Sequence, residues 1–417
     1  MVPADSVFMF VSTALVWVMT PAIALFYGGM VKSKNVLSTA MYSFGSLGIV
    51  SVLWILVGYS LAFSTGGNAI LGDLSWAGLH DVTFKPNADY SATIPHNLFM
   101  MFQMTFAVLT IAIISGGFVG RMRFSAYLIF ISLWCVLVYA PVAHWVWGVG
   151  GWIRNLGALD FAGGNVVHIS SGVAALILAL VLGKRKESET GRHNLMLVLI
   201  GGSLLWLGWF GFNVGSALSL NEVAMYAFIN TNTAAACGLI GWAAVEWIVN
   251  KKPTLSGAIS GGIAGLVAIT PAAGFVTPMA SILIGLVGGI VCFWGVTYLK
   301  SKLGYDDTLD AFGIHGIGGT WGGIATGLFA SKAVNSAGAN GLFYGDPSLV
   351  WKQLVAIVST YIFVGIVSFI IIKAIQLFMP IRVDEEAEKR GLDITLHGEH
   401  AYGQPYEDAV YEQAAAK

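Results

Sequence analysis

The sequence predicts an all-α polytopic membrane protein. Charged residues make up only 10% of the 417 positions, whereas soluble domains carry about 25%, so the chain cannot cover a water-facing surface with charge. Hydrophobic residues make up 56%, and there are 52 glycines, which membrane helices use for close packing. This composition argues against a soluble enzyme, and we expect no enzymatic activity.

Charge balance and cysteine usage argue against further classes. The formal net charge is −1, so no basic field attracts nucleic acid. The three cysteines lie in apolar runs without a CxxC pair, which predicts neither a disulfide framework nor a metal site, and we expect no cofactor. The first residues, MVPADS, lack a cationic stretch, so a cleaved signal peptide is not expected.

Eleven apolar segments are bounded by charged residues and by loops rich in proline and glycine. The first, 6–31, contains no charge, and about 20 residues suffice to cross the hydrocarbon core. The charge-free run 253–299 is long enough for two spans, because Pro271 and Pro278 interrupt a helix between them. The expected spans are 6–31, 38–63, 97–119, 124–147, 164–183, 194–215, 223–249, 254–269, 279–298, 310–330 and 353–379.

The distribution of lysine and arginine sets the expected orientation. One set of loops carries twelve of these residues and the opposite set carries four, so the first set is expected in the cytoplasm. The N-terminus is then outside, and an odd number of spans places the C-terminus inside. The twelve are Lys32, Lys34, Arg121, Arg123, Lys184, Arg185, Lys186, Arg192, Lys251, Lys252, Lys300 and Lys302, and the four are Lys85, Arg154, Lys332 and Lys352.

The last segment, 380–417, differs in composition from the spans. Nine of the chain's 22 acidic residues lie in it. We expect a polar cytoplasmic tail, which serves either as a solubilising end or as a docking element for a cytosolic regulator.

Histidines within spans are functional candidates, because hydrocarbon penalises ionisable groups. His168 and His315 each follow an aspartate by eight positions, Asp160 and Asp307 respectively. Each histidine also lies in the fifth member of a five-span set, which indicates two halves with inverted topology and a shared site near the midplane. His144, in span four, has no such counterpart and is expected to pack or to form local hydrogen bonds.

The expected organisation follows from these halves. A transmembrane domain covers 1–379, with repeat one at about 6–183, repeat two at about 194–330 and a long eleventh helix at about 353–379; the tail covers 380–417.

Aromatic residues form a second candidate site. Phe102 and Phe106 lie four positions apart and so share a helix face, whereas Trp147 and Ser216 close spans at the expected external end. Aromatic faces attract cations, by about 2 kcal/mol when water is excluded. Interfacial tryptophan belts and core phenylalanine stripes give the same pattern, so composition alone does not select these positions.

Long ordered motifs run from the first span into the tail: PAIALFYGGMVKSKNVL (21–37), FQMTFA (102–107), APVAHWVWG (140–148), DFAGGNVVHISSG (160–172), WLGWFGFNVGSA (206–217), DAFGIHGIGGTWGG (310–323) and RVDEEAEKRGLDITLHGEHAY (382–402). These motifs resemble the Amt/Mep/Rh family of ammonium transporters, in its prokaryotic Amt form. The resemblance implies an 11-helix protomer in the cell membrane, assembled as a homotrimer with one pore per subunit. It implies uptake of ammonium or its analogue methylammonium for nitrogen supply, and block by a PII-type signal protein.

The same resemblance implies a role for each matching residue. Because the loop between Trp147 and Asp160 is one residue longer than the bacterial pattern, Trp145 and Trp152 stay open as alternatives to Trp147. The implied roles are an external ammonium site of Trp147, Phe106 and Ser216 with Phe102 in its floor, a gate of Phe106 and Phe212, paired pore histidines His168 and His315, and a structural and proton-handling acid, Asp160.

A mechanism follows if ammonium behaves like the alkylammonium group of lysine. Desolvation lowers such a pKa of about 10.4 by roughly 3–5 units, so the recruited cation becomes able to lose its proton. We expect neutral ammonia to cross the pore, with the proton moving in the same direction.

Three other classes of protein are considered against the sequence. Two histidines on different helices can ligate haem, although no CxxCH motif occurs. An ammonium receptor would have to signal through its short tail alone. A coupled carrier for a larger solute is disfavoured, because no span shows a sharp break that carries a run of polar ligands.

Overall fold

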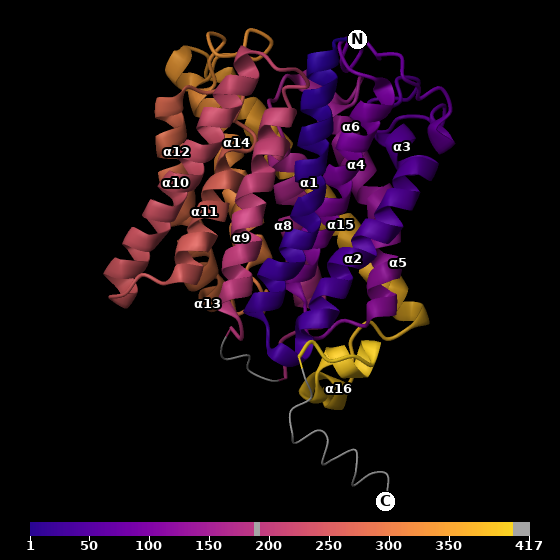
Figure 1. The fold of residues 1–417 in the computed structure, drawn as a ribbon, viewed down its shortest axis with the longest axis vertical. Coiled ribbons are helices and arrows are strands. Elements are labelled where there is room, and N and C mark those ends of the chain that lie inside the picture. The colour runs from indigo at the N-terminus through magenta and orange to yellow at the C-terminus, as the bar shows by residue number, and fades with distance from the viewer. Residues whose placement is uncertain (187–191, 403–417) are drawn as a thin grey trace, which may run out of the picture.

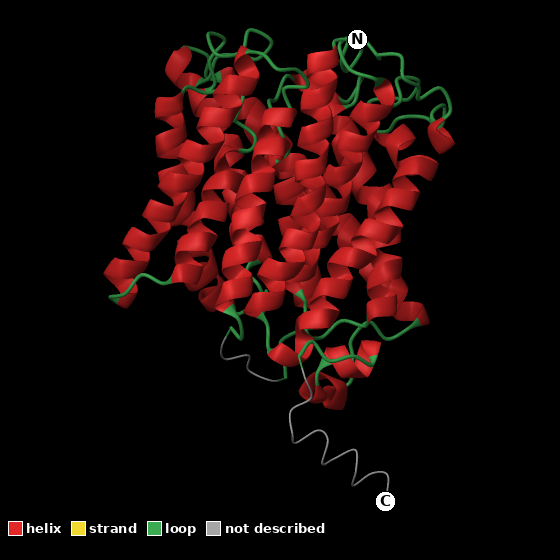
Figure 2. Ribbon diagram, viewed as in Figure 1, coloured by secondary structure: helices red, strands yellow, loops and turns green. Residues whose placement is uncertain are grey.

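The described fold is helical throughout. The computed structural model describes residues 1–186 and 192–402. Long helices run side by side as a bundle, with loops at its two ends (Figure 1, Figure 2). In this part of the chain the only extended pairings are two isolated bridges. The predicted all-α architecture is therefore confirmed.

Each of the eleven predicted segments contains a helix. Nine helical stretches among the described residues are long and apolar enough to cross a bilayer. The two shorter helices are α11 (Leu255–Ile269) and α14 (Ile317–Phe329). The others are α1 (Pro3–Met30), α2 (Val36–Leu53) continued into α3 (Tyr59–Phe63), α4 (His96–Ile114), α5 (Phe124–Trp134) continued into α6 (Ala140–Trp147), α8 (Ser170–Leu182), α9 (Leu195–Trp209), α10 (Glu222–Asn250), α12 (Pro278–Trp294) and α15 (Ser348–Phe378).

Several of these helices are widened by π-helical turns, which the hydrophobic pattern does not reveal. Such turns insert one residue into a helix and frequently occur at functional sites. Three of them carry candidate residues: η6 (Gly164–Ile169) precedes α8, η7 (Phe210–Val214) follows α9, and η9 (Phe312–Gly316) precedes α14.

Glycines account for the close packing of the helices. A Cβ atom on Gly265 of α11 would lie 2.1 Å from the Ala234 carbonyl oxygen of α10. A Cβ on Gly289 of α12 would lie 2.2 Å from the Gly238 carbonyl oxygen of α10. These backbones approach so closely that any side chain at either position would force them apart, which explains part of the high glycine content.

The π-helical segments η6 and η9 meet in the middle of the bundle. A Cβ on Gly172 of α8 would lie 2.4 Å from the Gly316 backbone nitrogen, and one on Gly319 of α14 would lie 3.0 Å from the Gly164 carbonyl oxygen. Helix α8 therefore lies against η9, and α14 lies against η6, and these contacts fix the positions of His168 and His315.

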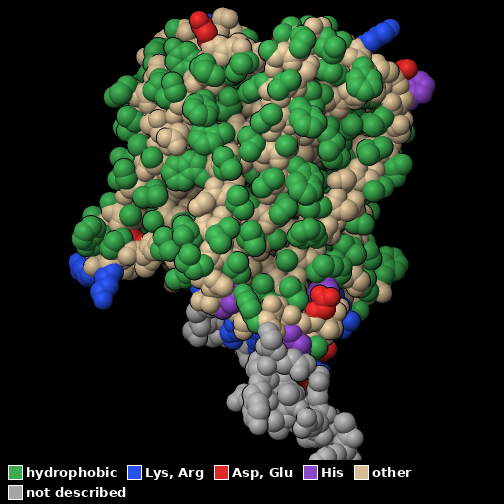
Figure 3. Space-filling view, in the orientation of Figure 1, with side chains coloured by type: hydrophobic (Ala, Val, Ile, Leu, Met, Phe, Trp, Pro, Cys, Tyr) green, Lys and Arg blue, Asp and Glu red, His purple; other side chains and the backbone are tan. Residues whose placement is uncertain are grey.

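The surface and the tail fit a membrane protein with a polar end. Figure 3 shows hydrophobic side chains covering the sides of the bundle, whereas lysine and arginine gather mainly at its lower end. The tail helix α16 (Glu385–Arg390) lies at that end, opposite the N-terminus (Figure 1). Residues 403–417 of the predicted tail lie outside the described residues.

The tail is anchored to the ends of the helices. The Asp393 carboxylate accepts hydrogen bonds from the backbone N–H groups of Leu37, at 3.0 Å, and Ser38, at 2.7 Å, in the first turn of α2.

Two loops outside the tail are joined by an ion pair between Arg185 and Asp306, with an N···O distance of 2.6 Å. Burial opposes ionisation of Asp306, but the hydrogen bonds and charge of Arg185 outweigh it and lower the Asp306 pKa to about 2.

Candidate functional site

The two span histidines lie in direct contact at the centre of the bundle. The Nδ1 atoms of His168 and His315 are 3.2 Å apart, and both side chains are buried. One imidazole must donate to the other across this contact, because neutral histidine carries a single N–H. The His168 Nε2 atom has no hydrogen-bond partner among the described residues, so it is available to a third molecule.

Aspartates at equivalent positions hold the two π-helical turns. The Asp160 carboxylate accepts hydrogen bonds from the N–H groups of Gly163, Gly164 and Asn165, at 2.8, 2.6 and 2.7 Å. The Asp307 carboxylate accepts from Ala311 and Phe312, at 3.1 and 2.8 Å. A carboxylate at a helix N-terminus satisfies free N–H groups and complements the helix dipole. The eight-residue spacing thus reflects a shared way of placing each histidine.

Aromatic rings form a continuous stack that leads to the histidines. The rings of Phe106 and Phe212 are stacked with their centroids 4.1 Å apart. On the inner side, Phe212 lies 6.0 Å from His168 at an interplanar angle of 22°. Trp209, one turn earlier in the same helix, stacks on His168 at 5.5 Å. At a centroid distance of 4.1 Å the Phe106 and Phe212 rings are in contact, so a hydrated ion cannot pass between them without their movement.

A cavity of about 220 Å³ lies on the other side of the Phe106–Phe212 stack; we call it the vestibule. The Trp147 indole N–H donates to the Asp160 carbonyl oxygen at 2.9 Å, which fixes the ring beside Phe106 at 6.0 Å. The Ser216 hydroxyl donates to the Phe212 carbonyl oxygen at 2.8 Å. Its lone pairs therefore remain for an incoming donor. The lining residues are Phe63, Asp89, Tyr90, Phe99, Gln103, Phe106, Val146, Trp147, Arg154, Phe161, Ser216 and Leu218.

The structure distinguishes the candidate tryptophans. Trp147 lines the vestibule, whereas Trp145 donates to the Ile70 carbonyl oxygen at 2.8 Å and packs on Phe363, away from that cavity. Trp152 packs against Trp145. Among the three tryptophans, only Trp147 is thus placed beside Phe106 and Ser216.

Phe102 lies behind the vestibule rather than in its wall. Its ring is fully buried and contacts Phe106 edge-on with the centroids 4.8 Å apart. Phe102 is therefore placed to support Phe106 and does not reach the cavity directly.

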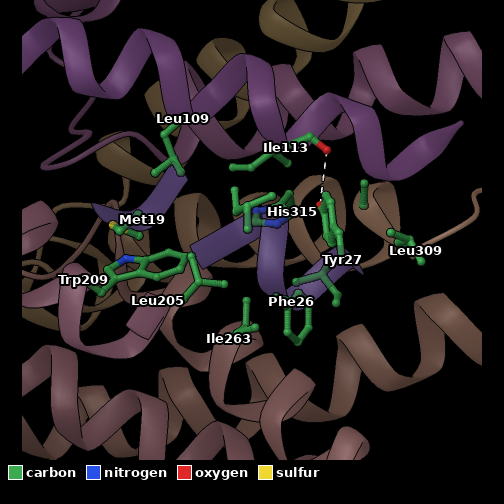
Figure 4. A pocket seen from close by; sticks show the side chains of 13 residues that line it. Met19, Phe26, Tyr27, Leu109, Ile113, Leu205, Trp209, Ile263, Leu309 and His315 are labelled. Carbon is green, nitrogen blue, oxygen red and sulfur yellow. Dashed lines mark hydrogen bonds between the residues drawn. The ribbon is translucent and has the colours of Figure 1, made fainter. Parts of the chain in front are cut away.

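A second, much smaller cavity lies on the inner side of the histidine pair. Its volume of about 20 Å³ has room for about one water-sized molecule. Figure 4 shows His315 among mostly apolar side chains, with the Tyr27 hydroxyl bonded to the Ile113 carbonyl oxygen at 3.3 Å. Its lining residues are Met19, Ile23, Phe26, Tyr27, Leu109, Ile113, Leu205, Trp209, Ile263, Leu309, Ala311, Ile314 and His315.

Haem fits this centre poorly. The two histidine nitrogens lie only 3.2 Å apart, and the adjacent cavity of about 20 Å³ cannot hold a macrocycle. Within 1–186 and 192–402 no cluster of three histidine, cysteine or acidic residues is arranged to hold a metal ion. The Nδ1 and Nε2 atoms of His144 instead lie 3.0 and 2.8 Å from the carbonyl oxygens of Ala62 and Asn68, and its one N–H can donate to either, in the local role expected for it.

Two neighbours of the site were missed from the sequence. Trp209 lies three residues before Phe212 in WLGWFGFNVGSA, so its helical spacing gives it a place on the same pore-facing side. Gln103 lies between the two phenylalanines of FQMTFA and lines the vestibule. A polar residue in an apolar span is a functional candidate by itself, and that criterion would have identified Gln103.

Comparison with known proteins gives one consistent answer. A family model described as Ammonium Transporter Family matches residues 7–402. An ammonium transporter of Bacillus subtilis is 71% identical over 95% of this chain and 98% of its own length. A putative ammonium transporter of Methanothermobacter thermautotrophicus is 50% identical over 95% and 98%. The crystal structure of Saccharomyces cerevisiae Mep2 superposes with a TM-score of 0.86 at 37% identity, covering 92% of this chain and 90% of that one.

Proposed function

The chain belongs to the ammonium transporter family, and on that premise we propose that it recruits ammonium in the vestibule and conducts it inward as ammonia. In this proposal ammonium transfers its proton to vestibule water beside the aromatic gate, and the proton moves in the same direction as ammonia. The observation that carries the proposal is the unbroken stack of Phe106, Phe212 and His168, which joins a roomy vestibule to a cavity of molecular size.

Recruitment takes place in the vestibule. The rings of Trp147 and Phe106 lie 6.0 Å apart and nearly perpendicular, at 84°, so both can contact one small cation. A partly desolvated cation gains about 2 kcal/mol from such faces, and the Ser216 hydroxyl oxygen accepts one of its N–H groups. These contacts suffice to concentrate a cation, but they do not compensate for complete loss of its hydration shell.

The gate forces the change from ion to neutral molecule. Transfer of a bare ion into an apolar passage costs tens of kcal/mol in the Born limit. Ammonium avoids this cost by losing a proton, because desolvation lowers the pKa of such a group by roughly 3–5 units. Potassium has no proton to lose, so the same passage excludes it.

The histidine pair then provides hydrogen-bonding groups for ammonia in the inner pore, and the Tyr27 hydroxyl lies in the wall of the same cavity. The unpartnered Nε2 of His168 contacts the incoming molecule, and His315 presents its ring to the inner cavity. Exchange of tautomers between the two Nδ1 atoms can pass a proton across the 3.2 Å contact. Asp160 holds the turn that carries His168, and its carbonyl oxygen accepts from the Trp147 indole of the vestibule.

The proposal includes the organisation expected from the sequence. The chain crosses the cell membrane eleven times, with the N-terminus outside, a transmembrane domain at 1–379 and a cytoplasmic tail at 380–417. The two repeats, about 6–183 and 194–330, form one pore per subunit of a homotrimer, and helix eleven completes each subunit. A PII-type signal protein binds at the cytoplasmic face. The two halves that meet at Gly172 and Gly316 support this arrangement.

Uptake of radiolabelled methylammonium into proteoliposomes tests the function. We expect saturable uptake that ammonium competes away and that His168→Ala strongly reduces. Binding of methylammonium without uptake would overturn transport and favour a receptor that signals through its tail. If the protein shows neither binding nor uptake, the vestibule assignment is rejected as well.

A further inference from the structure

Helix α4 presents one polar side chain among the aromatic rings of the vestibule. Phe99, Gln103 and Phe106 follow each other at spacings of four and three, so they share one face of the helix. All three line the vestibule. Gln103 therefore lies on the wall that also carries the ring expected to bind the cation.

The Gln103 amide is not satisfied by the protein. The residue is 8% exposed, and its Oε1 atom is buried without a hydrogen-bond partner in the described part of the chain. Buried acceptors are normally paired, because an unpaired one loses its water without replacement. An unpaired amide oxygen on a side chain that lines a cavity indicates a hydrogen-bond donor that arrives from the cavity.

Ammonium supplies the donors that this wall needs. It carries four N–H donors and no acceptor, whereas the ammonium group of lysine carries three donors and no acceptor. Ser216 offers one oxygen, and the faces of Phe106 and Trp147 take two further N–H groups. The amide oxygen of Gln103 is the remaining neutral acceptor with no partner among the side chains that line the vestibule.

We propose that the Gln103 amide oxygen is a fourth ligand for ammonium and sets the preference for ammonium over methylated amines. Rotation of the terminal amide turns the oxygen toward the cation without repacking, since the two ends of the amide have nearly the same shape. Methylammonium has only three N–H groups, so it gains less from a fourth acceptor. This inference rests on the proposed external site and adds a specificity-determining residue to it.

Two substitutions test the role of the amide in proteoliposome uptake. Gln103→Leu keeps the approximate volume and removes the acceptor, and we expect the half-saturating ammonium concentration to rise about tenfold. For methylammonium the rise should be at most about threefold, so the preference for ammonium falls. Gln103→Glu keeps the shape and adds charge, and should lower the half-saturating ammonium concentration at low ionic strength.

Controls separate this inference from the proposed function. Gln376→Leu changes an exposed glutamine near the end of α15 and should leave both concentrations unchanged. If Gln103→Leu behaves like wild type while Ser216→Ala raises the half-saturating concentration, the Gln103 inference is overturned and the external site stands. If Ser216→Ala also behaves like wild type, the external site itself is wrong. Should Gln103→Leu fail to fold, unchanged affinity in Gln103→Glu would overturn the inference.

Discussion

The vestibule and the inner pore differ in almost every property that governs how a cation is handled. The vestibule has a volume of about 220 Å³ and a wall that mixes aromatic rings with Ser216 and Gln103. The inner cavity has about 20 Å³ and is mostly apolar apart from His315 and the Tyr27 hydroxyl. The stacked rings of Phe106 and Phe212 lie between the vestibule and His168. The first region suits an ion and the second suits a small neutral molecule.

This difference assigns affinity to one region and selectivity to the other. Changes in the vestibule should alter how much ammonium is needed for half-maximal flux. Changes in the inner pore should alter which molecules cross. Each prediction below tests that division.

The largest effect is expected at the histidine pair. His168→Ala removes the ring on which Trp209 and Phe212 stack, and the freed space admits water. The ratio of ammonium flux to potassium flux should fall at least about tenfold. Parallel ammonium and potassium flux assays measure the ratio, and His80→Ala, in an exposed loop, should not change it. Unchanged selectivity would remove the histidines from the mechanism.

A somewhat smaller effect is expected for the acid that supports His168. Asp160→Asn keeps the shape, but one oxygen is replaced by an NH₂ group that faces backbone N–H donors. Charge-assisted hydrogen bonds of this kind contribute about 1.5–3 kcal/mol each, so the apparent unfolding temperature should fall by about 3–5 °C. Flux should fall together with stability, as thermal unfolding and uptake on one preparation would show. A stable variant with normal flux would contradict the positioning role.

An effect on affinity alone is expected in the vestibule. Ser216→Ala should raise the half-saturating ammonium concentration about three- to tenfold, because one acceptor is lost. The maximal flux and the exclusion of potassium should stay the same. Loss of potassium exclusion in this variant would show that the vestibule and the inner pore do not divide the tasks.

The smallest effect concerns an ion pair remote from both regions. The pKa of Asp306 is about 2, below its unfolded value of about 3.9, so the pair stabilises the fold above pH 4 and loses this contribution between pH 4 and 2. Asp306→Asn should lower the unfolding temperature by about 1–2 °C at pH 7 and by less at pH 3. Thermal unfolding at the two pH values checks this, and the difference between variant and wild type should not grow on acidification.

The sequence predicts the regular part of the fold better than its irregular part. Long apolar segments and the paired spacing of Asp160 with His168 follow from composition and position, because hydrocarbon dictates both length and polarity. The π-helical turns do not follow, since a single inserted residue barely changes an already uniform apolar pattern. They decide which side of the helix carries His168, Phe212 and His315.

Contacts between distant segments are the other limit. The family resemblance implies Phe102 for the floor of the external site, and in the structure Phe102 lies behind Phe106. The sequence does not predict the contact of Trp209 with His168, because the two residues belong to different spans. Gln103 is recognisable as a polar residue within an apolar span, but that it lines one cavity with Trp147 and Ser216 follows only from the structure.

The central claim is that ammonium enters the vestibule as an ion and crosses the inner pore as ammonia. Proteoliposomes on a solid-supported membrane, with a pH indicator in the lumen, test it directly during pulses of ammonium and of potassium. The account predicts a saturable inward current with ammonium and none with potassium at any concentration tested. Alkalinisation of the lumen without current would mean that ammonia crosses and the proton stays outside. A saturable potassium current through the wild-type protein would contradict the account, because that ion can pass only intact.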